Sequence, residues 1–208
     1  MCGIAGFCSD QVIYDQEKEK WKTILQNMNQ AQKRRGPDED GWYLSSHCGM
    51  AHVRLSVIDL ETGQQPMTRT RQGHTCTLVM NGEIYNMHEL RKELENLGVE
   101  FETSSDTEVM LLGYLVYGEG ILSRLNGIFA AALWDEEKET LFLFRDRVGV
   151  KPLFYTRTKD SLVYASEIKG LLQYPGIKAR VDEEGLCEIF ALGPAKTYGK
   201  GVFQDVRE

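Results

Sequence analysis

The second residue of the chain, Cys2, has the chemistry of a nucleophile placed beside its own base. Removal of Met1, which is expected before so small a residue, frees an α-amine close to the thiol, and such an amine can deprotonate a nucleophile. Its pKa of ~7.7–8.0 leaves on the order of a tenth of it unprotonated at pH 7, far more than a lysine. Cys2 is therefore a candidate catalytic nucleophile; a frayed chain end is the alternative.

Asn81 and Gly82 directly follow an apolar run at residues 75–80 that predicts a buried strand. A side-chain amide and a backbone N–H at this place can bind the oxyanion that develops in acyl transfer. Removing one such donor typically lowers the rate by about 10²–10³. The alternative is a hairpin turn, for which Asn-Gly is a preferred pair. Taken alone, the dipeptide favours the turn.

Three charged residues have the types needed to bind the two ends of an amino acid. Arg54 lies within an apolar strand segment, where a guanidinium is costly unless it binds an anion. Asp106 lies at a predicted helix start, and Glu83 follows the Asn-Gly pair. The alternatives are an internal salt bridge for Arg54 and a helix N-cap for Asp106.

Composition restricts the classes of function. The 208 residues suit one large domain or two small ones. The net charge is −7, with Lys33-Arg34-Arg35 as the densest basic run, so a nucleic-acid partner is not expected. The five cysteines are scattered without CxxC spacing, which predicts no zinc site and a reducing compartment. No signal peptide and no apolar stretch of ~18 residues is seen. We therefore expect a cytoplasmic protein that does not bind a membrane.

Apolar periodicity predicts the elements that position these groups. Strands are expected at residues 2–7, 42–44, 50–58, 75–80, 128–134, 140–144, 153–155 and 162–165. Helices are expected where Trp21, Ile24, Leu25, Met28 and Ala31 share a face, from a capping-box-like start at Asn86 and Glu89, from Ser105-Asp106, and near Glu167 and Glu183. Two blocks of strands, with helices between and after them, predict an α+β layered domain.

Six segments occur in a recognisable order: MCGIAGF at 1–7, RRGPDEDGWY at 34–43, AHVRLSVIDLETGQQPM at 51–67, NGEIYN at 81–86, SSDTEV at 104–109 and FRDRVGVKPLFY at 144–155. Together they resemble the N-terminal glutaminase domain of glutamine-hydrolysing asparagine synthetase. That domain is a class II glutamine amidotransferase of the N-terminal-nucleophile hydrolase family. The resemblance covers nearly the whole chain, and RLSVID and NGEIYN favour this branch over the phosphoribosyl-amine and glucosamine-phosphate relatives.

The resemblance implies a four-layer αββα sandwich with the cysteine at a strand end between the sheets. It also implies roles for a set of site residues: Cys2 as nucleophile, Asn81 and Gly82 as oxyanion hole, Arg54 and the backbone around Val57 at the glutamine carboxylate, and Glu83 and Asp106 near its ammonium group. The motif Arg35-Gly36-Pro37-Asp38 is expected to line the site, without an assigned chemical step.

The implied reaction is hydrolysis of the glutamine side-chain amide through a γ-glutamyl thioester on Cys2, with L-glutamine as substrate. This half-reaction needs no metal or cofactor. Residues 2–208 would form the glutaminase domain at the front of a longer protein, whose C-terminal synthetase domain uses ATP and Mg²⁺. No Gly-Gly pair of a pyrophosphate loop occurs here, so this chain alone should not make asparagine. A homodimer stays open.

Two other functions compete with this interpretation. The same fold could act as a non-catalytic scaffold or regulatory domain, since motif matches are hypotheses. The chain could also hydrolyse some other small amide. Arg54 together with Asp106 argues for a free α-amino acid, because both charges would otherwise lie unpaired near the site.

Overall fold

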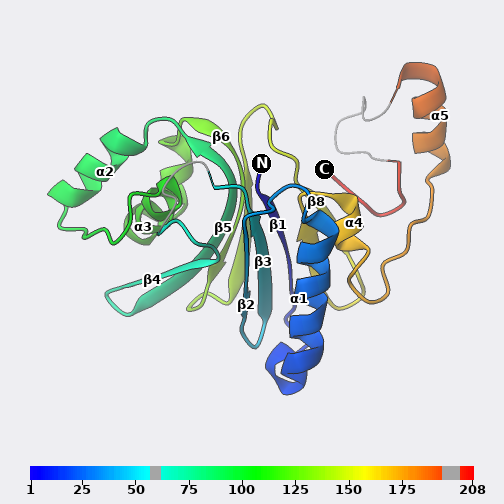
Figure 1. Ribbon diagram of the computed structural model, residues 1–208, viewed down its shortest axis with the longest axis horizontal. Helices are drawn as coiled ribbons and strands as arrows, with labels where there is room; N and C mark the ends of the chain where they lie inside the picture. The colour runs from blue at the N-terminus through cyan, green and yellow to red at the C-terminus, as the bar shows by residue number, and fades with distance from the viewer. Residues whose placement is uncertain (57–61, 194–201) are drawn as a thin grey trace.

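Two antiparallel sheets lie face to face in the computed structural model, which describes residues 1–56, 62–193 and 202–208. The first sheet has the strand order β2-β3-β1-β9-β8 and the second the order β4-β5-β6-β7. Figure 1 shows α1 and α4 on the outer side of the first sheet, and α2 and α3 on the outer side of the second. This is the four-layer αββα sandwich that the sequence predicts.

The bounds of the elements follow the chain. The first sheet consists of β1 (Gly3–Cys8), β2 (Glu39–Leu44), β3 (Cys48–Arg54), β8 (Phe154–Arg157) and β9 (Leu162–Ala165). The second consists of β4 (Met67–Arg71), β5 (His74–Ile84), β6 (Gly127–Asp135) and β7 (Thr140–Arg145). The helices are α1 (Lys18–Gln32), α2 (Met87–Asn96), α3 (Asp106–Tyr117), α4 (Ile168–Leu171) and α5 (Glu183–Leu192), with short 3-10 helices η1 (Tyr14–Glu17) and η2 (Gly118–Ser123).

Three apolar cores hold the four layers together, one at each interface. Alternation along β1 shows how a single strand serves two of them: Phe7 packs beneath α1, while Ile4 packs between the sheets. Leu94 and Met110 lie in the third core, between the second sheet and its helices. Full burial of each such side chain contributes about 1.5–3 kcal/mol. β1 is thus covered on both faces, which explains its continuous apolar run.

β5 continues through the Asn-Gly pair instead of turning there. Asn81 pairs with Ala130 and Gly82 with Phe129 in the ladder with β6. The turn alternative is therefore wrong. A Cβ on Gly82 would lie 2.2 Å from the carbonyl oxygen of Ile128, so glycine permits a close approach of the two strands rather than a reversal.

The predicted capping box at α2 is also wrong. The Asn86 side chain makes no capping hydrogen bond; its Nδ2 donates to Arg124 O at 2.9 Å and its Oδ1 accepts from Asn126 N at 2.9 Å. Asn86 therefore ties the start of α2 to the segment before β6. A long-range pair of bonds has replaced the local one that the spacing suggested.

β4 was not predicted, because its sequence, MTRTR, has only one buried residue. It is an edge strand held to β5 by cross-strand pairs of like side chains: Thr68 Oγ1 lies 2.9 Å from Thr77 Oγ1, and Thr70 Oγ1 lies 2.8 Å from Thr75 Oγ1. The predicted strands at 128–134, 140–144, 153–155 and 162–165 agree with β6 to β9 within two residues. Among the described residues, no helix is long and apolar enough to span a bilayer.

Candidate active site

Cys2 immediately precedes β1, the central strand of the first sheet. Its Sγ lies 3.6 Å from Leu55 O, within reach of a weak hydrogen bond, and its own carbonyl oxygen accepts from Arg35 Nε at 2.8 Å. Since Gly3 pairs with Val53, the antiparallel register brings Cys2 alongside the end of β3. The thiol is therefore held at the N-terminal end of the central strand of the first sheet.

The motif Arg35-Gly36-Pro37-Asp38 secures the ends of β1 and β3. Besides Cys2 O, Arg35 contacts Glu167, with Nη1 to Oε1 at 3.5 Å. Asp38 N donates to Arg54 O at 3.1 Å, and Asp38 Oδ2 accepts from Ser56 N at 2.8 Å. A Cβ on Gly36 would lie 2.3–2.4 Å from the backbone between Val53 and Arg54, so only glycine fits without displacement. The motif acts on the position of other groups, which accounts for its lack of an assigned chemical step.

Arg54 ends β3 and lines a cavity of about 210 Å³. Its side chain is only 5% exposed, and Nη1 forms an ion pair with Glu39 Oε2 at 2.9 Å. The structural salt bridge expected as the alternative for Arg54 is therefore present, while its binding of a substrate carboxylate stays a prediction. Val57 lies outside the described residues, so its contact with the carboxylate stays a prediction.

The cavity brings together the described residues for which a catalytic or substrate-binding role is predicted. The motif Arg35-Gly36-Pro37-Asp38, which was expected to line the site, is not part of its wall. Its wall contains Met1, Cys2, Arg54, Leu55, Gly63, Gln65, Met80, Asn81, Gly82, Glu83, Ser105, Asp106, Thr107 and Lys151. Sequence reasoning missed Gln65 and Thr107, whose side chains are hydrogen-bonded to each other in the wall of the cavity. The GQQP run before Met67 was part of the family pattern, but no local signal indicated which glutamine faces the cavity.

Two hydrogen-bond donors on β5 are available at this wall. Asn81 is 1% exposed, and its Nδ2 has no acceptor among the described residues. The Tyr85 N–H bonds to Asn126 O on the β6 side, and alternation therefore directs the N–H groups of Met80, Gly82 and Ile84 to the opposite edge. A buried donor without an acceptor is costly, which is the arrangement expected where a ligand supplies the acceptor.

Asp106 begins α3, but it is not the helix cap. Ser105 Oγ accepts from Thr107 N at 3.1 Å and caps the helix, while Asp106 Oδ2 accepts from Ile84 N at 2.9 Å. Burial raises the pKa of Asp106, although hydrogen bonds from Ile84 and Thr107 act in the opposite direction. A buried carboxylate with a raised pKa gains from a cation placed beside it. Glu83 is exposed at the same wall.

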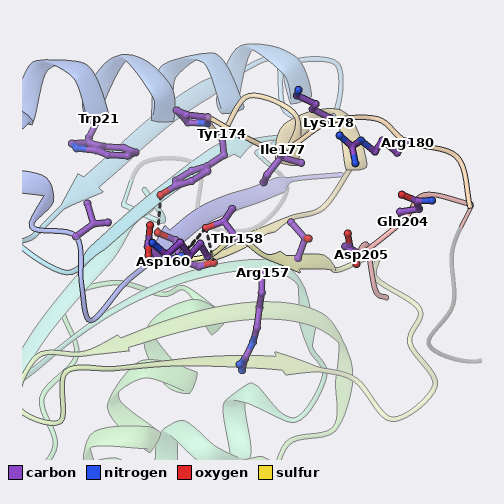
Figure 2. A pocket seen from close by; sticks show the side chains of 16 residues that line it. Trp21, Arg157, Thr158, Asp160, Tyr174, Ile177, Lys178, Arg180, Gln204 and Asp205 are labelled. Atoms are coloured by element: carbon purple, nitrogen blue, oxygen red, sulfur yellow. Dashed lines mark hydrogen bonds between the residues drawn. The ribbon is translucent and has the colours of Figure 1, made fainter.

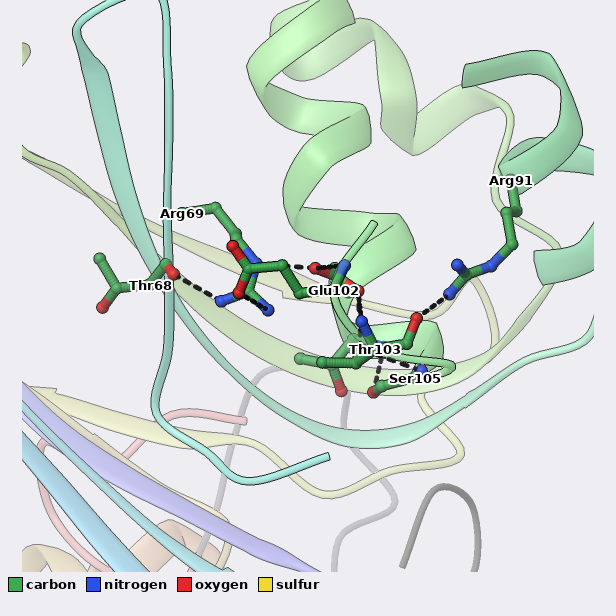
Figure 3. A network of polar contacts seen from close by, with 8 residues as sticks. Thr68, Arg69, Arg91, Glu102, Thr103 and Ser105 are labelled. Atoms are coloured by element: carbon green, nitrogen blue, oxygen red, sulfur yellow. Dashed lines mark hydrogen bonds and ion pairs between the residues drawn. The ribbon is translucent and has the colours of Figure 1, made fainter. Parts of the chain in front are cut away.

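The loop before α3 is fastened by a fully buried carboxylate, Glu108. Figure 3 shows Arg69, Glu102 and Thr103 of this network. Glu108 accepts from Thr103 N at 2.7 Å, Thr103 Oγ1 at 2.7 Å, Glu102 N at 3.0 Å and Arg69 Nε at 2.7 Å. Burial opposes its charge, but these hydrogen bonds together hold the pKa of Glu108 below its ordinary value. The start of α3, and with it Asp106, is thereby tied to β4.

One group of metal-ligand types occurs within the described residues, at the far end of β5. Single donor atoms of His74, Cys76 and Asp135 lie within 4.8 Å of one another. Asp135 is already hydrogen-bonded by His74 Nε2 at 2.8 Å and by Tyr114 OH at 2.9 Å, and Lys138 Nζ lies 3.1 Å from it. Burial raises the pKa of the Cys76 thiol to about 12. This cluster is a hydrogen-bonded network remote from the cavity.

A larger cavity, of about 580 Å³, lies beside α1 and the turn after β8 (Figure 2). It is lined by Trp21, Tyr174 and several charged side chains, and Figure 2 shows Arg157 directed away from Lys178 and Arg180. None of the predicted site residues that the structure describes lines it. Size alone does not identify the site; converging donors and a nucleophile do.

Comparison with known proteins shows the family of the chain. Asparagine synthetase [glutamine-hydrolyzing] 3 of Bacillus subtilis (strain 168) is 47% identical over 208 residues, which cover 100% of this chain and 33% of the relative. Asparagine synthetase B of Escherichia coli (strain K12) is 39% identical over 173 residues, covering 83% of this chain and 30% of the relative. The chain thus spans about a third of the length of these relatives, and the predicted resemblance is confirmed.

Solved structures show the same fold at lower identity. The allosteric regulatory enzyme of purine biosynthesis superposes with a TM-score of 0.66 at 22% identity, covering 83% of this chain and 43% of that one. Glutamine phosphoribosylpyrophosphate amidotransferase of B. subtilis gives 0.63 at 24% identity, covering 82% and 43%. A family model described as a glutamine amidotransferase domain matches residues 1–208. The chain therefore belongs to the glutamine amidotransferase domain family.

Proposed function

We propose that this chain hydrolyses the side-chain amide of L-glutamine to give glutamate and ammonia. The observation that carries the proposal is the pair of donors on β5. Asn81 Nδ2 and the Gly82 N–H border the same cavity as the Cys2 thiol, and Asn81 Nδ2 has no acceptor among the described residues. Donors held ready for an oxyanion stabilise the transition state without reorganisation.

In the proposed mechanism the Cys2 thiol attacks the amide carbon of glutamine. The negative charge that develops on the amide oxygen is bound by Asn81 Nδ2 and the Gly82 N–H. The α-amine of Cys2, freed by removal of Met1, accepts the thiol proton and delivers it through a water molecule to the leaving nitrogen. The C–N bond then breaks, so that ammonia departs and a γ-glutamyl thioester is left on Cys2, and water hydrolyses this thioester to glutamate.

The ends of the amino acid select the substrate. Arg54 binds the α-carboxylate, to which the backbone around Val57 would add a contact, and Asp106 binds the α-ammonium with Glu83 nearby. The burial of Arg54 and Asp106 supports this assignment, because a buried charge gains most from a charged partner. An amide without both end groups would not engage both side chains.

The ammonia would serve ATP-dependent synthesis of asparagine from aspartate by a C-terminal synthetase domain. This extension relies on the names of the relatives. The matched region is about a third of the relative's own length. Glutamine hydrolysis itself needs no metal or cofactor, so ATP and Mg²⁺ would be required only by the synthetase half. We place the protein in the cytoplasm, where free thiols persist.

Replacing the nucleophile tests the proposal. Cys2→Ala should lower glutamate release from glutamine to background, a loss of at least about 10³-fold, with an unchanged midpoint of thermal unfolding. Cys187→Ala, an exposed cysteine on α5, is the control and should retain full activity. Mass spectrometry reports whether Met1 is removed. A Cys2→Ala protein that still releases glutamate would exclude Cys2 as nucleophile.

The proposed role of the α-amine needs a separate comparison. A protein with an uncleavable extension before Cys2 keeps the thiol but binds the amine in a peptide bond, so it should be as inactive as Cys2→Ala. Full activity of the extended protein would contradict the amine as the base. The assignment of the thiol as nucleophile would then depend on the Cys2→Ala test alone.

A further inference from the structure

Gln65 lies where β5 loses its strand partner. The ladder between β4 and β5 begins with Met67 opposite Leu78, so β4 does not reach the part of β5 that carries the site. Beyond Leu78, the N–H groups of Met80, Gly82 and Ile84 point to this open edge, as shown above. A strand edge of this kind needs other acceptors if its backbone is to keep one geometry.

Side chains supply two of those acceptors. Met80 N donates to Gln65 Oε1 at 2.6 Å, and Ile84 N donates to Asp106 Oδ2 at 2.9 Å. The Gly82 N–H lies between these two satisfied groups and faces the cavity. The edge of β5 is therefore held on either side of the donor that is proposed to bind the oxyanion.

The other end of the Gln65 amide reaches α3. Its Nε2 donates to Thr107 Oγ1 at 3.1 Å, next to Asp106. The backbone of Gln65 is itself held against the first sheet, because a Cβ on Gly41 of β2 would lie 2.2 Å from Gln65 O. One side chain thus links the segment before β4, the edge of β5 and the start of α3.

The Met80 carbonyl is tethered from the opposite sheet. His52 Nε2 on β3 lies 3.2 Å from Met80 O. Burial lowers the pKa of His52 to about 4, so the ring is neutral at pH 7. Because Met80 O can only accept, this contact requires the tautomer that carries its hydrogen on Nε2. The residue before Asn81 is consequently held at both its N–H and its C=O.

We propose that Gln65 is a positioning residue for the oxyanion hole. By accepting from Met80 N and donating to Thr107, its amide sets the direction of the Gly82 N–H and the Asn81 side chain relative to Asp106. This inference rests on the proposed glutaminase function. Gln65 need not touch glutamine to act, so its loss should affect the transition state more than substrate binding.

Three substitutions separate positioning from bulk packing. Gln65→Met keeps the length but removes both hydrogen bonds, whereas Gln65→Glu keeps an acceptor for Met80 N and can accept from the Thr107 hydroxyl. Gln64→Met is the matched control, because Gln64 is exposed and does not line the cavity. Steady-state hydrolysis of glutamine and the midpoint of thermal unfolding are measured for each purified protein.

For Gln65→Met, kcat should fall about 10-fold or more, short of the ~10²–10³ expected for removing a donor outright, while KM changes less than about 3-fold. Gln65→Glu should recover most of that kcat, a rescue that lost packing would not produce. Should Gln65→Met fail to fold, Gln65→Asn replaces it: the shorter amide cannot reach Met80 N, so its kcat should lie below that of Gln65→Glu.

Several results would overturn the inference. A Gln65→Met protein as active as Gln64→Met would show that the Met80 bond is dispensable, and a rise in KM at constant kcat would make Gln65 a substrate contact instead. Equal loss in Gln65→Glu and Gln65→Asn would exclude the acceptor role. A wild-type protein that releases no glutamate overturns the proposed function itself, which distinguishes the two failures.

Discussion

At the scale of single residues, the site is built from polar groups that the protein buries without fully satisfying. Asn81 Nδ2 lacks an acceptor among the described residues, and Asp106 is 5% exposed with a pKa raised mainly by burial. Each arrangement costs stability in the free protein. A substrate with an amide oxygen and an ammonium group would offset both of these costs. The groups proposed for the chemistry are therefore also groups that lower the stability of the free protein.

The raised pKa of Asp106 predicts a pH dependence of binding. The ammonium of glutamine pairs with the carboxylate, so affinity is full at higher pH and weakens as the pH falls through that pKa. The weakening should begin above the range of an exposed aspartate, ~3.9. Calorimetric titration of glutamine into Cys2→Ala, which binds without turnover, measures it.

Asp106→Asn in the same background should bind glutamine more weakly at neutral pH and lose the acid-dependent phase. Asp10→Asn, at an exposed position, is the control and should titrate like its parent. A dissociation constant that stays level in the parent down to pH ~4 would exclude Asp106 as the partner of the ammonium.

At the scale of elements, three strands carry most of the site, and the start of α3 adds Asp106. Cys2 immediately precedes β1, Arg54 is the last residue of β3, and Asn81 and Gly82 lie within β5. Gly36 lies against the end of β3 so closely that a methyl group cannot be added without moving the backbone. The position of Arg54 therefore depends on a residue with no side chain of its own.

Gly36→Ala should lower both stability and activity. Its Cβ would lie 2.3 Å from Val53 C, and overpacking of this kind costs about 1–3 kcal/mol. Glutamine KM should rise because Arg54 moves with the strand end. Gly120→Ala is the control, since Gly120 has no heavy atom within 4 Å of a built Cβ. Urea unfolding measures the loss of stability, and steady-state kinetics measure the rise in KM. A stable, fully active Gly36→Ala protein would contradict the close packing.

At the scale of the whole molecule, two buried carboxylates join α3 to the second sheet. Glu108 ties the loop before α3 to β4, and Asp135 ties β6 to Tyr114 on α3. Burial opposes the charge of each carboxylate, yet hydrogen bonds hold both pKa values below the ordinary range. Glu108 accepts these bonds from Thr103, Glu102 and Arg69. Asp135 accepts them from His74, Lys138 and Tyr114. The helical layer over the second sheet is thus partly held by charge.

Acid should therefore unfold this protein. Because the folded pKa values are lowered, the stability that these carboxylates contribute is fully present above their ordinary pKa of about 4 and is lost as the pH falls through the folded values. Glu108→Gln should cost about 1.5–3 kcal/mol at neutral pH and should lose less further stability on acidification.

Urea midpoints at several pH values measure this effect. Glu95→Gln, at an exposed position on α2, is the control and should follow the wild type. Parallel pH dependence of Glu108→Gln and wild type would mean that the acid sensitivity originates elsewhere.

The sequence by itself determined the fold class, the family and the residue types at the site. Period-two and helical patterns are local properties, so β6, β7 and β9 could be predicted closely, and the six motifs identified the family before any contact was known. Cys2 could be recognised because its chemistry depends on its place in the chain. Edge strand β4 could not be predicted, because only one residue on its inward face is apolar.

Only the tertiary structure decided which alternative applied to each ambiguous residue. Asn81-Gly82 proved to be strand rather than turn because β6 pairs along its full length. Asn86 proved to be a long-range tether, and Arg54 both an ion-pair partner and a cavity wall. Gln65 acquired its place from Met80 and Thr107, which are 15 and 42 positions away. Such roles depend on contacts between distant segments, and no local pattern in the chain records the energy of those contacts.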